Sequence, residues 1–127
     1  MLAACGPTAR KANAICAQDG VAERRRFCDG FTEAAGSVCR NISEGFARFE
    51  SSQIVQFFGY ALGSLGEVED YLRECRTREF IDEHRFAADL ELVQHTRAKT
   101  LRFLQYHQRK QRERKARNAQ PKAAKRC

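Results

Sequence analysis

The chain has 127 residues and a formal net charge of +7, a length that suits one domain with a core and is too short for two. The charge is uneven, because residues 109–127 hold nine Lys/Arg and one acid, whereas residues 1–108 hold fourteen basic and fifteen acidic side chains. No apolar run approaches membrane-spanning length, and no secretory segment is recognisable. The composition therefore predicts no membrane partner and places the basic character in the C-terminal segment.

The cysteines and histidines show no metal-ligand spacing. There is no C-x-x-C pair, and the three histidines His84, His95 and His107 lie far apart. We therefore expect reduced thiols in a cytoplasmic protein, with no metal site and no cofactor. The six cysteines are Cys5, Cys16, Cys28, Cys39, Cys75 and Cys127.

The first half of the chain predicts two helices. Pro7 and an alanine-rich run to Ala17 indicate a short first helix that stops at residues 18–20. The second begins near Ala22 and ends near Gly45, a glycine at a suitable C-cap position. Its apolar stripe has helical spacing and comprises Phe27, Phe31, Ala34, Ala35, Val38, Ile42 and Phe46.

The second half predicts two further helices. Ser51 or Ser52 caps the third helix, which runs to about Arg76, and Asp82 caps the fourth. The third stripe comprises Ile54, Phe57, Phe58, Ala61, Leu62, Leu65, Val68, Leu72 and Cys75. The fourth comprises Phe86, Leu90, Val93, Thr100, Leu101 and Leu104. Arg97 falls inside this last stripe, where it is either ion-paired near a bundle end or a register or ligand contact.

The fold class that these stripes predict is all-α. Four antiparallel helices with short connections are the simplest way to bury four apolar stripes, so residues 1–108 are expected to form a four-helix bundle. Residues 109–127 are expected to form a basic tail, of which the first part extends the last helix and the part from Asn118 is disordered.

Three glycines in the third helix, Gly59, Gly63 and Gly66, fall on the side opposite its apolar stripe. Each costs roughly 1 kcal/mol relative to alanine in a helix interior. Close approach by another backbone would account for that cost, so this side is a candidate oligomer interface.

Two motifs carry a family resemblance. Residues 37–48 read S-V-C-R-N-I-S-E-G-F-A-R, and residues 61–67 read A-L-G-S-L-G-E. Together they resemble the pattern S-I-P-A-N-I-A-E-G-F-G-R followed by A-L-G-S-L-x-E, found in four-helix bundle proteins encoded in intervening sequences of 23S rRNA genes. The resemblance spans roughly residues 27–104. It implies an up-down-up-down left-handed bundle, a ring-like pentamer and no enzyme activity.

The chain departs from this pattern at several positions. The family's proline is Cys39, its alanine is Arg40, and an arginine pair before the first motif falls on Thr32 and Glu33. A basic surface at that end of the second helix is therefore not expected. A related branch, the accessory variability protein of diversity-generating retroelements, binds nucleic acid and works with a reverse transcriptase. That branch implies a reverse transcriptase as a candidate partner.

Polar residues form a line beside each apolar stripe in the two middle helices. If these helices pack antiparallel, the two lines flank one groove. The groove has three interpretations: hydrogen bonding between helices with oligomer packing, a ligand or partner site, or acid–base catalysis by Glu44 and Glu67. The first line is Ser37, Asn41, Glu44 and Arg48, and the second is Tyr60, Ser64, Glu67 and Tyr71.

The basic tail is the strongest functional signal. Its cations can neutralise phosphates without reading bases, although the segment contains no aromatic residue for stacking. We therefore expect a non-enzymatic homo-oligomer associated with RNA or DNA, with RNA preferred through the family resemblance. The alternative is an assembly module that recruits a partner protein and whose tail only increases solubility. The candidate contacts are Arg109, Lys110, Arg112, Arg114, Lys115 and Arg117.

Overall fold

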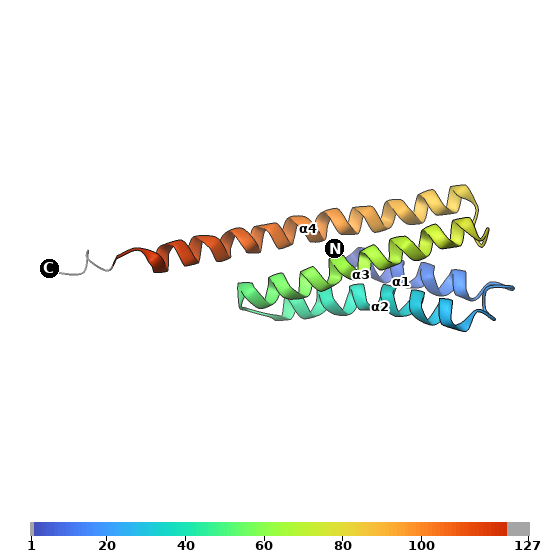
Figure 1. Ribbon diagram of the computed structural model, residues 1–127, viewed down its shortest axis with the longest axis horizontal. Helices are drawn as coiled ribbons and strands as arrows, with labels where there is room; N and C mark the ends of the chain where they lie inside the picture. Colours follow the sequence, from blue (N-terminus) through green and yellow to red (C-terminus); the bar gives the residue numbers. More distant parts are fainter. Residues whose placement is uncertain (1, 122–127) are drawn as a thin grey trace.

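The computed structural model describes residues 2–121, with the backbone alone described for residues 2–4. Four α-helices follow one another in it: α1 (Leu2–Cys16), α2 (Arg25–Ala47), α3 (Ser51–Thr77) and α4 (Glu83–Ala119). Each helix packs against its neighbours in sequence, and α1 also contacts α4, which closes an antiparallel bundle (Figure 1). The predicted all-α bundle is confirmed.

The helices differ in length, and this gives the two ends of the bundle different surfaces. The N-terminus lies midway along the bundle, so α1 flanks only the half nearer the α1–α2 connection (Figure 1). The other half is built from α2, α3 and α4 alone. Beyond the α2–α3 connection, α4 continues as a single projecting helix (Figure 1).

The predicted stripes account for most of the core. Phe31, Ile42, Phe58 and Leu65 are fully buried or nearly so, at helical spacing along α2 and α3. Two predicted core residues are corrected, because Phe46 is 45% exposed and Leu101 is 40% exposed. Both stay accessible in the part of the chain that α1 is too short to reach.

In α4 the buried stripe is partly polar. Asp89, Thr96 and Thr100 lie in it beside Phe86, Val93 and Leu104. Thr96 and Thr100 donate hydrogen bonds to carbonyls one turn earlier, at 2.9 and 2.7 Å, so their hydroxyl groups are satisfied within the helix. Arg97 lies outside the stripe, is exposed and pairs with Glu69 at 3.4 Å, as its ion-pair interpretation predicts.

Four predicted helix boundaries are wrong, and one of them is the start of α2, which lies at Arg25 and not near Ala22. α1 begins at Leu2 and not at Pro7, and the turn ahead of the proline includes the buried Cys5. α2 continues two residues past Gly45, which is buried beneath the Phe58 ring. Glu50 occupies the N-cap position of α3, without a side-chain hydrogen bond, in place of Ser51 or Ser52.

The predicted start of α4 is confirmed. The Oδ1 atom of Asp82 accepts a hydrogen bond from the backbone N–H of Arg85 at 2.7 Å, the arrangement of an N-cap residue. At its other end α4 crosses residues 108 and 109 without a break. It includes Asn118, where disorder was expected, and it ends at Ala119. Gln120 is the C-cap residue, and the following Pro121 restricts its backbone, which ends the helix. Residues 122–127 of the predicted tail lie outside the described residues.

Candidate nucleic-acid interface

The projecting part of α4 holds the six predicted basic contacts. At 100° per residue they fall on all sides of the helix, and Glu113 is the one acid among them. Nearly every side chain from residue 109 to residue 121 is exposed. The result is a rod of positive charge with no apolar face of its own, open to solvent around its whole circumference. The residues are Arg109, Lys110, Arg112, Arg114, Lys115 and Arg117.

At the root of this rod, cations lie beside an aromatic ring. The guanidinium carbon of Arg109 is 5.6 Å from the centre of the Tyr106 ring, and the ammonium of Lys110 is 5.5 Å from it. Both distances are within the range of cation–π attraction. Tyr106 itself is 42% exposed. The basic segment therefore begins next to an accessible tyrosine.

Tyr106 belongs to a larger aromatic group, which we call the aromatic end cluster. Phe58 is fully buried and anchors the cluster. Its ring centre lies 5.4 Å from that of Phe46 and 5.0 Å from that of Phe103. Phe46 and Phe103 are 5.2 Å apart, and Phe103 reaches Tyr106 at 6.4 Å. Three helices thus contribute rings to the end of the bundle where the basic rod begins.

His107 also packs into this cluster. Its ring centre is 4.7 Å from that of Phe103, and its Nδ1 atom is buried without a hydrogen-bond partner among the described residues. Burial lowers the pKa of His107 below its usual value, since the apolar surroundings disfavour the charged imidazolium. The neutral ring is therefore favoured at pH 7, and His107 adds aromatic surface here and no charge.

Sequence reasoning did not find the aromatic end cluster. It placed Phe46 in the core stripe and found no aromatic residue within residues 109–127. The sequence did contain one indication of it, the short first helix. A first helix that does not run the whole length of the bundle leaves side chains of the other three helices uncovered.

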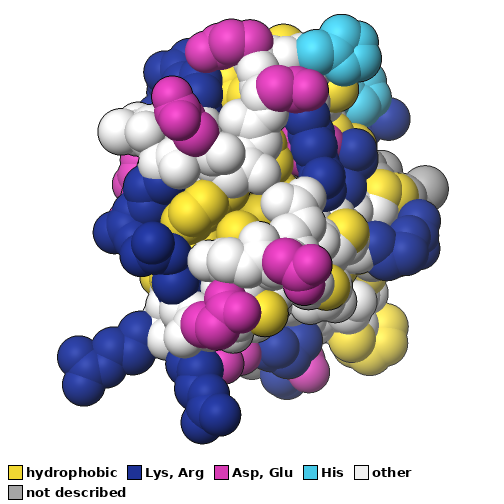
Figure 2. All heavy atoms as spheres, turned by 90° about the vertical axis from the view of Figure 1, so that its right-hand side faces the viewer, with side chains coloured by type: hydrophobic (Ala, Val, Ile, Leu, Met, Phe, Trp, Pro, Cys, Tyr) yellow, Lys and Arg dark blue, Asp and Glu magenta, His cyan; other side chains and the backbone are white. Residues whose placement is uncertain are grey.

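The opposite end of the bundle has a different character. Figure 2 views that end, where acidic and basic side chains are interspersed with some hydrophobic surface between them. Its arginines lie over rings of the same end: Arg24 is 5.2 Å from the Phe80 ring centre, and Arg76 is 4.2 Å from that of Phe86. Among the described residues, the run of six cations with a single acid is residues 109–117, where α4 projects past the other end of the bundle.

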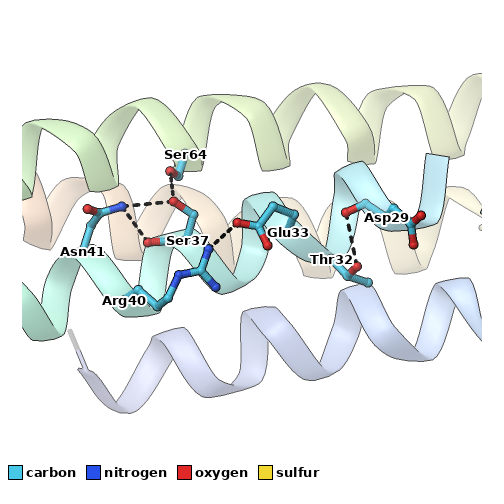
Figure 3. Close-up of polar contacts among 7 residues, drawn as sticks. All are labelled: Asp29, Thr32, Glu33, Ser37, Arg40, Asn41 and Ser64. Atoms are coloured by element: carbon cyan, nitrogen blue, oxygen red, sulfur yellow. Dashed lines mark hydrogen bonds and ion pairs between the residues drawn. The ribbon is translucent and has the colours of Figure 1, made fainter. Parts of the chain in front are cut away.

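The structure brings three members of the two polar lines together. The hydroxyl groups of Ser37 on α2 and Ser64 on α3 are 2.8 Å apart, and Ser64 is 8% exposed (Figure 3). The Nδ2 of Asn41 donates to the carbonyl oxygen of Ser37 at 2.9 Å and contacts its hydroxyl at 3.0 Å. The link between the helices is therefore the serine pair, with Asn41 supporting it from the same helix.

The remaining members of the lines are separate. Glu44 pairs at 2.8 Å with Arg48, the C-cap residue of α2, and both are exposed. Tyr60 is 51% exposed, and its hydroxyl oxygen accepts a hydrogen bond from the Nε2 of Gln56 at 2.8 Å. Glu67 is exposed on α3. Glu44 is thus already paired with a cation, and the three interpretations of the groove stay predictions.

Tyr71, the last member, covers a glycine. Its ring stacks on that of Phe31, with centres 5.4 Å apart. A Cβ atom at Gly30 would lie 2.0 Å from the Tyr71 hydroxyl oxygen, so only glycine fits beneath the ring as it stands. Packing within the monomer therefore requires Gly30, a residue that sequence analysis did not single out.

Near the middle of α2, two residues that depart from the family pattern pair with each other. Arg40 forms an ion pair with Glu33, one of the two residues that replace the family's arginines (Figure 3). Both side chains are exposed. The positive charge of Arg40 is thus offset locally, in agreement with the expectation that no basic surface forms there.

The glycine face of α3 is open in the monomer. A Cβ atom added at Gly59, Gly63 or Gly66 would meet no atom within 4 Å. The monomer therefore gives no packing reason for these three glycines, in contrast to Gly30 and Gly45. Their role in an interface between copies stays a prediction.

Neither a metal site nor a membrane span is found in the described part of the chain. Within residues 2–121 no group of His, Cys, Asp and Glu side chains is arranged to hold a metal ion. No helix in that range is long and apolar enough to cross a membrane. Cys16, Cys39 and Cys75 are thiols, and burial raises the pKa of each to about 12.

Comparison with known families identifies the class of this bundle. The model of the 23S rRNA-intervening sequence protein family matches residues 9–102, which covers the bundle from the middle of α1 to the middle of α4. The chain therefore belongs to that family. Searches of curated proteins and of solved structures found no match. The match ends before the basic rod, so the rod lies outside the part of the chain that the family model covers.

Proposed function

We propose that the protein is a non-enzymatic, homo-oligomeric helical scaffold that associates with nucleic acid, RNA foremost, through the basic rod at the end of α4. The observation that carries the proposal is the placement of six basic side chains and one acid, residues 109–117, on an exposed helix that projects past the bundle (Figure 1). Apart from Arg109 and Lys110, which lie beside the Tyr106 ring, its cations are exposed beyond the end of the bundle. Phosphate neutralisation is a role that suits them.

The geometry of the rod suits phosphates and not base edges. At 1.5 Å per residue, residues 109–117 span about 12 Å, a length over which a few phosphates of one strand can be met. Cations pointing in all directions around the helix provide attraction without a fixed register. The expected binding is therefore non-specific in sequence and strongly dependent on salt.

Assembly would multiply this attraction. The family resemblance implies a pentamer, and the open glycine face of α3 supports an interface between copies. Several rods on one ring would bind by avidity, since the second contact with the same nucleic acid becomes intramolecular.

The preference for RNA rests on the family description, and a reverse transcriptase remains a candidate partner through the related branch. The thiol state of Cys16, Cys39 and Cys75 suits a reducing compartment such as the cytoplasm.

A second candidate is a protein-only adaptor. The exposed side chains of Phe46, Phe49 and Leu101 favour it, because accessible apolar surface often marks a protein interface. In that case the rod would serve solubility alone. Ionic strength separates the two candidates, since phosphate binding weakens steeply with salt and an apolar interface does not.

The test is a salt titration of RNA binding with matched charge variants. Arg112→Gln/Arg114→Gln removes two charges from the rod, and Arg25→Gln/Arg26→Gln removes two exposed charges from the opposite end of the bundle. We expect the first variant to weaken binding and to lower the slope of log affinity against log salt by about 1 to 2. The second should bind as the unaltered protein does. Equal effects of the two variants would mean that net charge, and not the rod, governs binding.

A further inference from the structure

The aromatic end cluster leaves rings accessible at the root of the basic rod. Phe46 is 45% exposed, Tyr106 is 42% exposed and Phe49 is 99% exposed. Phe49 lies in the α2–α3 connection, three residues beyond Phe46. A phenylalanine that is wholly exposed gains nothing from burial in the monomer, so its side chain is available to a partner.

Charge complementarity indicates what that partner is. Arg109 and Lys110 lie within 6 Å of the Tyr106 ring centre, at 5.6 and 5.5 Å. Arg48, the neighbour of Phe49 in sequence, lies 5.0 Å from the centre of the Phe57 ring. Accessible rings and cations thus alternate over this end of the bundle. The combination fits a polyanion that also carries flat π-surfaces, which is the description of a nucleic acid with unpaired bases.

A duplex does not meet this requirement. In a double helix the base faces are stacked on one another, so a protein ring can reach them only after unstacking. An unpaired segment offers base faces and phosphates at once. A purely apolar protein partner would leave the cations at the root of the rod without counter-charges.

We propose that Phe49, together with the exposed rings Tyr106 and Phe46 of the aromatic end cluster, stacks on unpaired bases of a single-stranded nucleic acid whose phosphates lie along the basic rod. This inference rests on the proposed function and names its substrate class: single strands or unpaired loops in preference to duplexes. The cluster supplies the stacking surface that residues 109–127 themselves lack.

The first experiment measures affinity of the full chain for a uridine oligonucleotide, the equivalent thymidine DNA strand and an RNA duplex of equal phosphate number. We expect Phe49→Ala to weaken binding to both single strands roughly tenfold and to leave duplex binding and the salt slope unchanged. Leu101→Ala removes another exposed apolar side chain without removing a ring, and should leave every affinity unchanged. Comparison of the two single strands shows whether the sugar contributes.

The second experiment uses fluorescence, because the chain contains no tryptophan. Phe49→Trp introduces one at the proposed stacking position, and its emission should be quenched when the uridine oligonucleotide binds. His84→Trp places the matched reporter on an exposed residue at the opposite end of α4, where emission should not change.

Three results would overturn the inference. Unchanged single-strand affinity in Phe49→Ala, with weaker binding in Arg112→Gln/Arg114→Gln, would leave the proposed function standing without stacking. An equal loss for single strands and duplex would assign Phe49 a general role. A change of oligomeric mass in Phe49→Ala would make the cluster an interface between copies. If the unaltered protein bound no nucleic acid even at low salt, the proposed function would fail first.

Discussion

The ammonium of Lys11 on α1 lies 2.6 Å from the Oδ1 atom of Asp89 on α4, and the Asp89 side chain is only 2% exposed. The pair joins the two helices whose contact closes the bundle. Arg85, one turn before Asp89, adds a weaker contact at 3.7 Å. A buried carboxylate needs such partners, because an unpaired charge away from water is strongly unfavourable.

Removal of Lys11 should therefore destabilise the fold. We expect Lys11→Met to lower the free energy of unfolding by about 1 to 3 kcal/mol, a range that allows for the partial exposure of Lys11 and for Arg85 nearby. Urea denaturation followed by circular dichroism measures the change. The double variant Lys11→Met/Asp89→Leu should recover part of the loss, since neither charge remains. If Lys11→Met were as stable as the unaltered protein, the ion pair would contribute nothing to the stability of the α1–α4 contact.

The α3–α4 connection contains a residue with an unfavourable backbone. Glu79 has φ of 61°, in the left-handed region that glycine adopts most easily. The N–H of Phe80 bonds to the carbonyl of Cys75 at 2.8 Å, and that of Glu79 to the carbonyl of Arg76 at 3.0 Å. These are the two bonds of a Schellman motif, in which glycine usually occupies the position of Glu79.

Glycine at this position should stabilise the protein. We expect Glu79→Gly to raise the free energy of unfolding by about 1 kcal/mol, because it relieves the left-handed strain. Glu79→Ala keeps the Cβ atom and serves as the control, with no comparable gain. Thermal unfolding of the two variants gives the comparison, and a gain in both would point to loss of the Glu79 charge as the cause.

Sequence reasoning predicted most of the fold, and its errors have physical causes. Helical periodicity located α2, α3 and α4, and the capping preference of Asp82 located the start of α4. Periodicity along one helix does not show where a neighbouring helix ends, and so Phe46 and Leu101 were placed in the core. It also leaves Asp89 out of the buried stripe, because the lysine that permits its burial lies on another helix. Of the candidate site, the cations of the rod were predictable, whereas the ring cluster beside them depends on tertiary structure.

Three thiols, the buried Cys75 and the half-buried Cys16 and Cys39, should react slowly. Burial raises the pKa of Cys16, Cys39 and Cys75 to about 12, so almost none of each is the reactive thiolate at pH 8. We expect a maleimide or disulfide reagent to modify these three sites far more slowly in the folded protein than in urea. Mass spectrometry of peptides resolves each site. Rates at Cys16, Cys39 and Cys75 that matched those of the unfolded chain would mean that the bundle opens readily.

The glycine face offers a test of assembly. Because a Cβ atom at Gly63 would meet nothing within 4 Å, Gly63→Leu should leave the monomer helical. If the face is an interface between copies, the variant should show a lower mass in light scattering than the unaltered protein. Gly6→Ala, on α1, is a control that should keep the assembly, because a Cβ atom there would make only an ordinary contact with Arg10 at 3.5 Å. An unchanged mass in Gly63→Leu would mean that the glycine face is not an interface between copies.

In the proposed function, the basic rod contacts the nucleic acid, and the bundle folds and assembles without the rod. The most direct measurement compares RNA binding by the full chain and by a chain ending at Gln108, each across a salt series and each sized by light scattering. Residues 112–121 are all exposed, so the shorter chain keeps the core contacts. We expect steeply salt-dependent binding by the full chain, and an equal oligomeric state with greatly weakened binding in the shorter one. Equal binding by both chains would instead place the contact on the bundle.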